Sequence, residues 1–422
     1  MNIVFVTTEL AALNNSAGGL ASFTANMAKI FAEKGHHVSI VLSRTKEENI
    51  IFENDIDVIP LYVPMKKWIQ IDKFSKLVCK FNRKFDKRNE DDIRRTIMNL
   101  YKGGQVKKVI QRLHKNEKID IIHYCNHGAF SRLSKKEIPY VVRISGFGNI
   151  CKGGANIPDG SINYKDNPLP LQDKLERRAI KKAKYVVTPS YLLSGIVKEN
   201  FGLDAMVIES PFVLRRQEWD YSVCEKYCLD KKKYIIHYGS LRYAKGTHIV
   251  AQLVKQLLCS YPDIHMVLAG NNEDLIDENG NKIKAVEYVK KSAGKFSNRV
   301  IYVGRLVREQ LYPLIQNAEL CLLPSRIENL SNACIEAMAM GKIVVATNGA
   351  SYEQLIDDYV NGFLCERDNA DSFLNAINQA LNMSIEEKTR MKEKAVKTVE
   401  RLNPEKIYER YLEFYEKVIR DW

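Results

Sequence analysis

The sequence predicts an α/β protein made of two Rossmann-like domains that face each other across a cleft. Three observations lead to this prediction. Short apolar runs typical of strands alternate with amphipathic helical segments, the alternation occurs twice, and 422 residues are enough for two hydrophobic cores. Strands that are apolar without a break are typical of parallel sheets covered by helices on both faces.

Each half of the chain contains its own set of expected strands. The first half has Asn2–Thr7, Val38–Ser43, Asp57–Val63, Ile119–Cys125, Tyr140–Ser145 and Tyr185–Thr188. The second half has Tyr234–Tyr238, His265–Ala269, Val300–Val303, Leu320–Leu323 and Ile343–Thr347. Strand–helix alternation implies right-handed crossovers, and ligands of such sheets bind at the carboxyl ends of the strands.

The domain boundaries follow from where this alternation stops and restarts. We expect an N-terminal domain over residues 1–210 and a linker over 211–232, which begins with Pro211 and is rich in charges. A C-terminal domain should span residues 233–403. The last segment, 404–422, has a broad apolar helical face, so we expect this helix to pack back on the N-terminal domain.

The composition excludes several classes of protein. Hydrophobic residues make up 45% and charged residues 27% of the chain, and no apolar run approaches the length of a membrane span. The opening MNIVFVTTEL reads as a strand because it has no basic region and no cleavage site of a signal peptide. The nine scattered cysteines indicate reduced thiols. Together these features predict a cytoplasmic protein.

Two glycine-rich junctions between a strand and a helix are candidate phosphate-binding loops. In NNSAGGLASF, Gly18 and Gly19 precede a helix, where backbone N–H groups can face an anion. In HYGSLRYAKGTHIV, Arg242 and Lys245 suit a diphosphate, because each phosphate needs a cation. The alternatives are a flexible turn and two solvated cations. Neither loop reads G-x-G-x-x-G or has a P-loop pattern, which disfavours dinucleotides and P-loop chemistry.

A third segment, SRIENLSNACIEAMAMGKIVVATNGA from Ser325, places two carboxylates in an otherwise apolar stretch. Glu328 lies just before a helix and Glu336 lies inside it. A structural explanation is that Glu328 caps the helix and Glu336 forms a salt bridge or is solvated.

With these segments in place, the chain resembles the retaining family-4 glycosyltransferases of the two-domain GT-B fold. The resemblance extends over nearly the whole length and is strongest from Tyr234 to Cys365. SRIENLSNACIEAMAMGKIVVATNGASYEQLIDDYVNGFL looks like the E-x7-E segment of the family, and SAGGLASFTANMAKIFAEKGHHV looks like its first glycine loop and helix. DIIHYCNHG and PYVVRISG match the strands that deliver residues to the acceptor side.

The resemblance implies a role for each matching position. Glu336 is expected to bind the ribose hydroxyls of a nucleotide-sugar donor and Glu328 to contact the transferred sugar. Lys245 matches the basic residue of the family's K-G step. The remaining donor-side positions are Gly18 and Gly19 at the phosphates, Arg305 at the base, and the amides of Ser331, Asn332 and Ala333 at the diphosphate.

The chain departs from the family pattern at two positions. Ser240 stands where the family usually has an arginine, and Arg242, two residues on, is the candidate substitute. Ser145 stands where the family often has a histidine that contacts the sugar or acceptor. His127 is a nearby candidate for the acceptor side, with a structural role as the alternative.

The predicted chemistry needs positive charge at the leaving phosphate. Lys245, Arg242 and helix-start amides can stabilise the charge that develops there, so no divalent metal or other cofactor is expected. The sequence offers no obvious protein nucleophile, which agrees with a leaving phosphate that accepts the acceptor's proton on the same face.

Most of the net charge of +13 lies in one segment. Between Met65 and Lys118 there are 17 Lys/Arg and 6 Asp/Glu residues. In one interpretation a helix there packs its apolar face, with Phe74, Leu77, Val78, Phe81 and Phe85, on the first domain. In the other, residues of about 66–95 bind an anionic membrane on its cytoplasmic face.

The sequence therefore predicts a glycosyltransferase (class EC 2.4). It should move sugar from a UDP- or GDP-sugar to a glycan or lipid-linked acceptor with retention of configuration, in cell-surface polysaccharide synthesis. The alternatives are a non-enzymatic basic binding protein and another GT-B enzyme such as a nucleotide-sugar epimerase. The charge is local and matches no nucleic-acid-binding module, so no nucleic-acid partner is predicted. The sequence leaves the base, sugar, acceptor and oligomeric state open.

Overall fold

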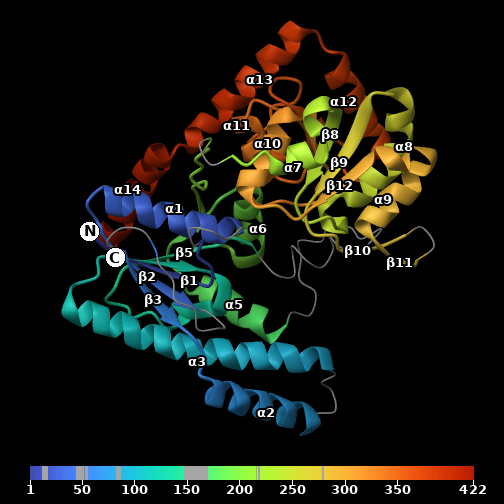
Figure 1. Ribbon diagram of the computed structural model, residues 1–422. Coiled ribbons are helices and arrows are strands. Elements are labelled where there is room, and N and C mark those ends of the chain that lie inside the picture. Colours follow the sequence, from blue (N-terminus) through green and yellow to red (C-terminus); the bar gives the residue numbers. More distant parts are fainter. Residues whose placement is uncertain are drawn as a thin grey trace. The chain divides into compact units, whose positions relative to one another are not determined.

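The computed structural model describes residues 1–11, 18–43, 52, 56–81, 87–146, 170–214, 216, 219–277 and 280–422. Contacts within the chain divide these residues into two compact units. The first unit contains the described residues up to 146, residues 170–211 and residues 404–422. The second contains the described residues from 212 to 403. Each unit is built around one parallel sheet (Figure 1).

The sheet of the first unit has the strand order β3-β2-β1-β4-β5-β6-β7, and every pair is parallel. Its strands are β1 Asn2–Thr7, β2 His37–Ser43, β3 Asp57–Leu61, β4 Ile121–Cys125, β5 Tyr140–Arg143, β6 Val186–Thr188 and β7 Met206–Val207. The central strands β1 and β4 are buried at every position, which explains their continuous apolar sequence.

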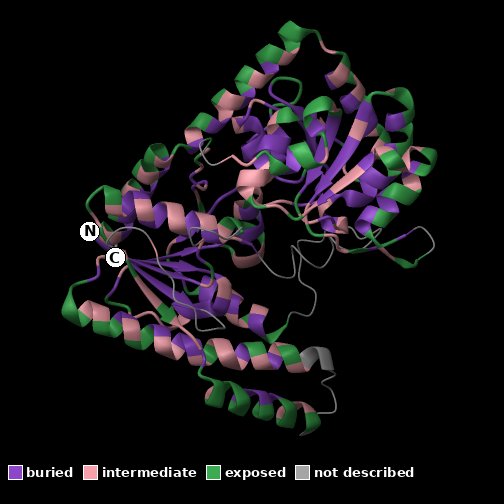
Figure 2. Cartoon of the chain, viewed as in Figure 1, coloured by how far each residue is buried: buried purple, intermediate pink, exposed green. Residues whose placement is uncertain are grey.

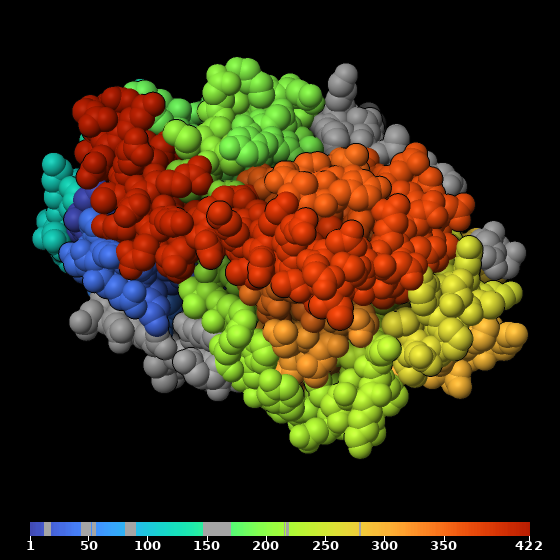
Figure 3. All heavy atoms as spheres, turned by 90° about the horizontal axis from the view of Figure 1, so that it is seen from above, coloured from blue at the N-terminus to red at the C-terminus, as the bar shows by residue number. Residues whose placement is uncertain are grey.

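Helices cover both faces of this sheet (Figure 1). They are α1 Gly19–Glu33, α2 Met65–Phe81, α3 Lys87–Asn116, η1 His127–Leu133, α5 Leu171–Lys181, α6 Tyr191–Phe201 and α14 Pro404–Arg420. The expectation for the last helix is confirmed, because α14 packs along α1 of the first unit (Figure 3). Tyr415 stacks on Phe31 at a centroid distance of 5.4 Å.

The sheet of the second unit has the order β12-β9-β8-β13-β14-β15, again all parallel. Its strands are β8 Lys233–Tyr238, β9 Ile264–Ala269, β12 Val300–Gly304, β13 Leu320–Leu323, β14 Ile343–Thr347 and β15 Phe363–Cys365. The hairpin β10 Asp274–Ile276 and β11 Lys282–Lys284 was not expected from the sequence. Counted within each unit, the strands of both main sheets follow the doubly wound order 3-2-1-4-5-6, and β7 adds a seventh strand beside β6 in the first sheet.

The helices of the second unit bury their apolar stripes against its sheet. They are α7 Ser222–Lys226, α8 Thr247–Ser260, α9 Ala285–Ala293, α10 Arg308–Asn317, α11 Asn332–Ala339, α12 Ala370–Asn382 and α13 Ile385–Val399. Short 3-10 turns connect them: η3 Leu229–Lys231, η4 Tyr243–Lys245, η5 Gly294–Arg299, η6 Tyr352–Gln354 and η7 Glu400–Leu402. Ile249, Leu253 and Leu257 of α8 are fully buried in the core, as their spacing predicts.

The packing of α2 differs from the first of the two interpretations of its sequence. In that interpretation Phe74 and Leu77 face the domain, but they are 54% and 49% exposed. Much of α2 is exposed to solvent (Figure 2). Among its described side chains, α2 buries Ile71, Asp72 and Ser75. Phe81 and Phe85 of the same expectation lie outside the described side chains. Periodicity identifies residues that share a helix face, but it does not decide which face meets the core.

Among the described residues, no helix combines the length and apolar character needed to cross a membrane.

Candidate functional site

The second unit changes its winding direction between β8 and β13, which are neighbours in the sheet. The loops that follow these two strands leave from the same edge, at their carboxyl ends. Such a switch point is the usual ligand site of an open parallel sheet. The loop after β8 contains Ser240, Arg242 and Lys245, and the loop after β13 leads to Glu328 and α11.

Glycine at position 246 allows these two loops to touch. Gly246 has φ +73°, and a Cβ there would lie only 1.9 Å from the carbonyl oxygen of Pro324. The N–H of Arg326 donates to the carbonyl oxygen of Ala244 at 3.0 Å. Any larger residue at 246 would push the loops apart, so the glycine that the sequence placed before α8 has a structural reason.

Lys245 and Glu328 form an ion pair where the loops meet. Lys245 Nζ donates to Glu328 Oε1 at 2.5 Å, although the two residues are 83 positions apart in the sequence. Their side chains are 26% and 13% exposed. The hydroxyl of Tyr352 also donates to Glu328 Oε1, at 3.5 Å. Because both side chains are largely shielded from solvent, this charge-assisted hydrogen bond fixes their orientation.

Glu336 is buried on α11 and bonded to α10. Its Oε1 accepts from the hydroxyl of Tyr312 at 3.3 Å and lies 3.4 Å from Nε of Arg308. Burial raises the pKa of the Glu336 carboxyl, while Arg308 and Tyr312 oppose this shift. The carboxylate keeps lone pairs beyond the one shared with these partners, so it can accept further hydrogen bonds.

The start of α11 lies between the two glutamates. Ser331 is the N-cap, and its hydroxyl accepts from the N–H of Cys334 at 3.3 Å. Asn332 and Ala333 form the first turn, and the carbonyl oxygen of Ala333 accepts from the hydroxyl of Tyr238 at 2.5 Å. N–H groups in a first helical turn have no partner within the helix, so they favour an anion.

The other predicted donor-side residues of this unit line the same edge. Arg242 is half-buried, and its Nε has no hydrogen-bond partner within the described part of the chain. Ser240 is half-buried directly after β8. Arg305 is exposed directly after β12, and Gly304 has φ +86°. In the sequence, Arg242 is the cation nearest to Ser240, the position at which an arginine was expected.

The remaining predicted residues belong to the first unit. Gly18 is the N-cap of α1 and Gly19 its first residue, and both are exposed. His127 follows β4, and its Nδ1 lies 3.9 Å from Oε2 of Glu176. The N–H of Ser145, beyond β5, donates to Oδ1 of Asn126 at 3.0 Å. All four lie at the carboxyl ends of β1, β4 and β5 or just beyond them.

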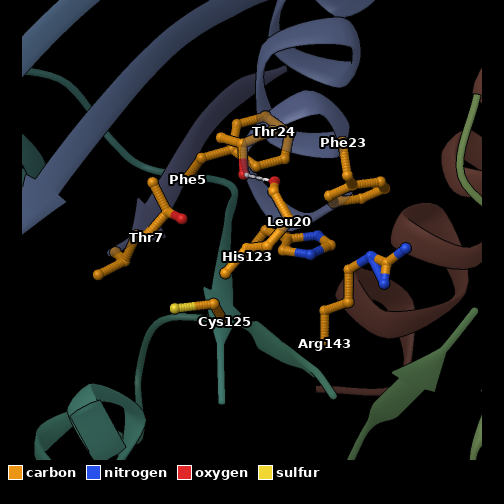
Figure 4. Close-up of a pocket in the computed structure, with 9 residues that line it drawn as sticks. Phe5, Thr7, Leu20, Phe23, Thr24, His123, Cys125 and Arg143 are labelled. Carbon is orange, nitrogen blue, oxygen red and sulfur yellow. Dashed lines mark hydrogen bonds between the residues drawn. The ribbon is translucent and has the colours of Figure 1, made fainter. Parts of the chain in front are cut away.

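The structure also reveals residues that the sequence reasoning missed. One of them is Arg143, which lies beside the ring of Phe23 in a small pocket at the carboxyl ends of β1, β4 and β5 (Figure 4). Arg143 is 2% exposed. A charged residue inside the apolar run PYVVRIS was the available signal, because arginine is seldom fully buried. The partners Arg308 and Tyr312 of Glu336 gave no such signal.

No group of three or more His, Cys, Asp or Glu side chains that could hold a metal ion occurs in the described part of the chain.

Comparison with known proteins finds relatives of the second unit. Residues 225–398 match the family model "Glycosyl transferases group 1". The chain is 24% identical over 202 residues to lipopolysaccharide 1,2-N-acetylglucosaminetransferase of Salmonella typhimurium, covering 46% of this chain and 52% of that protein. It is 29% identical over 154 residues to an uncharacterized glycosyltransferase of Haemophilus influenzae, covering 36% and 40%. These alignments span about half of each relative or less.

Solved structures match the whole fold. Sucrose-phosphate synthase of Thermosynechococcus elongatus superimposes with a TM-score of 0.68 at 16% identity over 100% of both chains. Trehalose-6-phosphate synthase gives 0.71 at 13% identity over 99% of both. HepE of Anabaena in complex with UDP-glucose gives 0.63 at 16% identity over 99% of this chain and 100% of that one. The chain therefore has the GT-B fold, and its residues 225–398 are similar to the glycosyl transferases group 1 family.

Proposed function

We propose that this protein transfers a sugar from a nucleotide-diphosphate sugar, with UDP or GDP as the nucleotide, to a glycan or lipid-linked acceptor with retention of configuration. The Lys245–Glu328 pair supports this proposal most directly, because it places a cation and a carboxylate together at the switch point. Buried Glu336 and the start of α11 extend the same edge. Relatives named glycosyltransferases and a structural neighbour bound to UDP-glucose agree with it.

In this proposal each group has one task. Glu336 accepts hydrogen bonds from the ribose hydroxyls, and its contacts with Arg308 and Tyr312 hold the carboxylate still. Glu328 orients the transferred sugar. Lys245 has three N–H donors and gives one to Glu328, so it retains donors for the diphosphate. Arg242 and the amides of α11 supply further positive potential.

The bond changes of the proposed transfer balance without a protein nucleophile. The bond between the anomeric carbon and the diphosphate oxygen breaks, and its electron pair stays on the diphosphate. The acceptor oxygen bonds to the anomeric carbon on the same face and loses its proton to the departing phosphate. Lys245, Arg242 and the helix-start amides stabilise the negative charge, and one well-placed donor contributes about 10²–10³ in rate. The proposal needs no metal ion.

A thermal-shift screen over nucleoside diphosphates and their sugars tests the donor. A ligand at about 100 times its dissociation constant adds about 2.7 kcal/mol of stability. We expect UDP or GDP to raise the melting temperature and the corresponding monophosphate to raise it less. Absence of a shift with every nucleoside diphosphate, together with no sugar transfer to a glycan or lipid-linked acceptor pool, would contradict the proposal.

Product analysis separates the remaining alternatives. Transfer with retention yields a glycoside with the anomeric configuration of the donor, which NMR coupling constants report. An epimerase yields a free or nucleotide-bound sugar with an inverted centre and no glycoside. A non-enzymatic binding protein yields no product at all.

We also propose that α2 docks on an anionic membrane surface, which suits a peripheral enzyme of cell-surface polysaccharide synthesis on the cytoplasmic face. The solvent side of α2 exposes Met65, Ile69, Phe74 and Leu77 to between 42% and 72%. Lysines of the same helix, Lys66, Lys73 and Lys80, are also exposed. Apolar side chains interleaved with lysines match the two requirements of a surface helix: burial in the acyl boundary and attraction to anionic lipid.

Liposome flotation tests the membrane proposal. The protein should float with vesicles that contain about a third anionic lipid and stay in solution with purely zwitterionic vesicles. Equal flotation with both, or with neither, would rule out charge-driven docking.

A further inference from the structure

Four side chains beside the candidate site join three separate loops of the second unit. We call Tyr243, His248, Arg326 and Asp368 the loop clamp. Asp368 lies between β15 and α12, and its Oδ2 accepts from Nε of Arg326 at 2.9 Å. Its Oδ1 accepts from Nε2 of His248, the second residue of α8, at 3.1 Å. One carboxylate therefore bonds to the first turn of α8 and to the loop that follows β13.

An aromatic contact completes the loop clamp. The rings of Tyr243 and His248 stack with a centroid distance of 3.8 Å and an interplanar angle of 11°. The guanidinium carbon of Arg326 lies 5.1 Å from the centroid of the Tyr243 ring. Arg326 is only 4% exposed, so its charge is stabilised by the carboxylate and the ring rather than by water.

The loop clamp lies two residues from each member of the ion pair. Tyr243 precedes Lys245 by two positions, and Arg326 precedes Glu328 by two. The backbone bond from the N–H of Arg326 to the carbonyl oxygen of Ala244 ties the same stretches together at 3.0 Å. A movement of Arg326 or Tyr243 therefore changes the distance between the lysine ammonium and the glutamate carboxylate.

The backbone and the charge of Asp368 are both consistent with a fixed position. Its φ is +58°, a left-handed conformation that costs energy for residues other than glycine, although aspartate tolerates it better than most. Burial raises the pKa of the Asp368 carboxyl, but the bonds to His248 and Arg326 outweigh it, and the net pKa is lowered. The carboxylate is therefore ionised at neutral pH and available to both partners.

We propose that Asp368 is a positioning residue of the transfer reaction: through Arg326 and His248 it holds Lys245 and Glu328 at the spacing that the leaving diphosphate and the sugar require. This inference rests on the proposed function. Asp368 itself need not touch the donor, so its effect should appear mainly in kcat. A misplacement of about 1 Å at the reacting groups can cost about 10²-fold in rate.

The first test compares Asp368→Ala with Asp371→Ala, an exposed aspartate three residues later. Asp368→Ala removes both bonds and should lower kcat about 10- to 100-fold, while the KM for the donor changes less than about 3-fold. Asp368→Asn keeps one acceptor oxygen for Arg326 and should recover part of the loss. Asp371→Ala should leave both constants unchanged. An Asp368→Ala enzyme with wild-type kcat would overturn the proposal.

A double-variant cycle tells positioning from a merely structural role. If Asp368 acts through Lys245, adding Asp368→Ala to Lys245→Ala should lower the rate by less than about 3-fold further. Losses that multiply in full would show that Asp368 acts independently of Lys245, and this inference would then be wrong.

Hydrogen exchange tests the loop clamp without any assay of transfer. In Asp368→Ala, the amides of Arg326 and Glu328, which donate to Ala244 and Ala350, should exchange about 10-fold faster or more, while amides of β9 keep their protection. Unchanged exchange would refute the loop clamp even in an active enzyme. Faster exchange in a protein that neither binds nucleotide nor transfers sugar would instead refute the proposed function.

Discussion

The two units each bury an arginine and a histidine near the carboxyl ends of their central strands, but they compensate the buried charge differently. The second unit buries Arg326 at 4% exposure and His237 at 1%. The first unit buries Arg143 at 2% and His123 at 3%. In both units the histidine lies on a strand at the switch point, β8 or β4.

In the second unit both His237 and Arg326 have hydrogen-bond partners. Nδ1–H of His237 donates to the carbonyl oxygen of Leu322 at 3.0 Å, and Nε2 accepts from the hydroxyl of Thr247 at 3.1 Å. These two bonds select one tautomer of the neutral ring. Arg326 has the carboxylate of Asp368. Such a network specifies one arrangement of the loops around the site.

In the first unit some buried side-chain nitrogens have no hydrogen-bond partner among the described residues. Nη2 of Arg143 donates to the hydroxyl of Ser210 at 2.8 Å, and its guanidinium lies 3.8 Å from the centroid of Phe23. Among the described residues, Nε and Nη1 of Arg143 and Nε2 of His123 have no hydrogen-bond partner. The comparison teaches that the buried arginine of the second unit is held by a carboxylate, whereas the buried arginine of the first unit has no carboxylate partner among the described residues.

The sharpest test of this difference removes the cation or the buried acid of the second unit. Lys245→Ala and Glu336→Ala should each lower transfer about 10²–10³-fold, because each removes a charged group from the donor site. Steady-state kinetics with the donor found by the thermal screen measures the loss. Lys255→Ala and Glu393→Ala, both exposed in the same unit, serve as controls. Near-normal turnover in both site variants would refute the role of this edge.

The second test measures the free energy of unfolding at acidic pH. Burial lowers the pKa of His237 from 6.5 to about 4. The folded protein then binds fewer protons than the unfolded chain, so stability is full above pH 6.5 and is lost as pH falls toward about 4. The shift corresponds to about 3 kcal/mol. Urea unfolding at pH values between 7 and 4 should show this loss, and His237→Gln should flatten it. If the wild type and His237→Gln lost the same stability between pH 7 and 4, His237 would not be a neutral, hydrogen-bonded histidine in the folded protein.

The third test compares the two buried arginines directly. Arg326→Met leaves Asp368 without its cation and should lower the free energy of unfolding by about 1–3 kcal/mol. Arg143→Met removes a buried cation that has no carboxylate partner. The bond to Ser210 is lost, but the cost of burying an unpaired charge is removed as well. The free energy of unfolding should therefore change by less than about 1 kcal/mol. Urea midpoints of the two variants provide the measurement. Equal losses would mean that the difference in pairing has no energetic consequence.

The smallest expected effect concerns the surface charge of the first unit. Lys73→Ala on the exposed side of α2 should weaken binding to anionic vesicles by about 1 kcal/mol, which is about 5-fold. Lys394→Ala, an exposed lysine of α13 in the second unit, should change nothing. Vesicle titration of both variants gives the result, and equal binding would remove α2 from the proposed membrane contact.

Much of the fold follows from local sequence patterns. The runs from Asn2 and Ile343 are strands with the expected ends, since a short, continuously apolar segment between turn residues fits best as a buried parallel strand. The two-residue strand β7 and the hairpin β10–β11 escaped prediction, because strands this short leave no periodicity. The domain boundaries inferred from the linker at 211–232 stay predictions.

The candidate site was less predictable. Spacing placed Glu328 before a helix and Glu336 inside it, and the structure confirms these two placements. Nothing in the local sequence indicated that Asp368 lies against Arg326, since 42 residues separate them. The same holds for Arg308 at Glu336, and the sequence left open whether Phe74 faces the domain or points outward.

By itself, the sequence determined the α/β class, the two rounds of strand–helix alternation and the glycines that permit close loops, because these depend on periodicity and on backbone conformation. Only the tertiary structure decided which charges meet: Lys245 with Glu328, Arg326 with Asp368, and Arg143 with no carboxylate among the described residues. The physical reason is that electrostatic and packing interactions act between neighbours in space, and neighbours across adjacent parallel strands are separated in the chain by whole helices and strands.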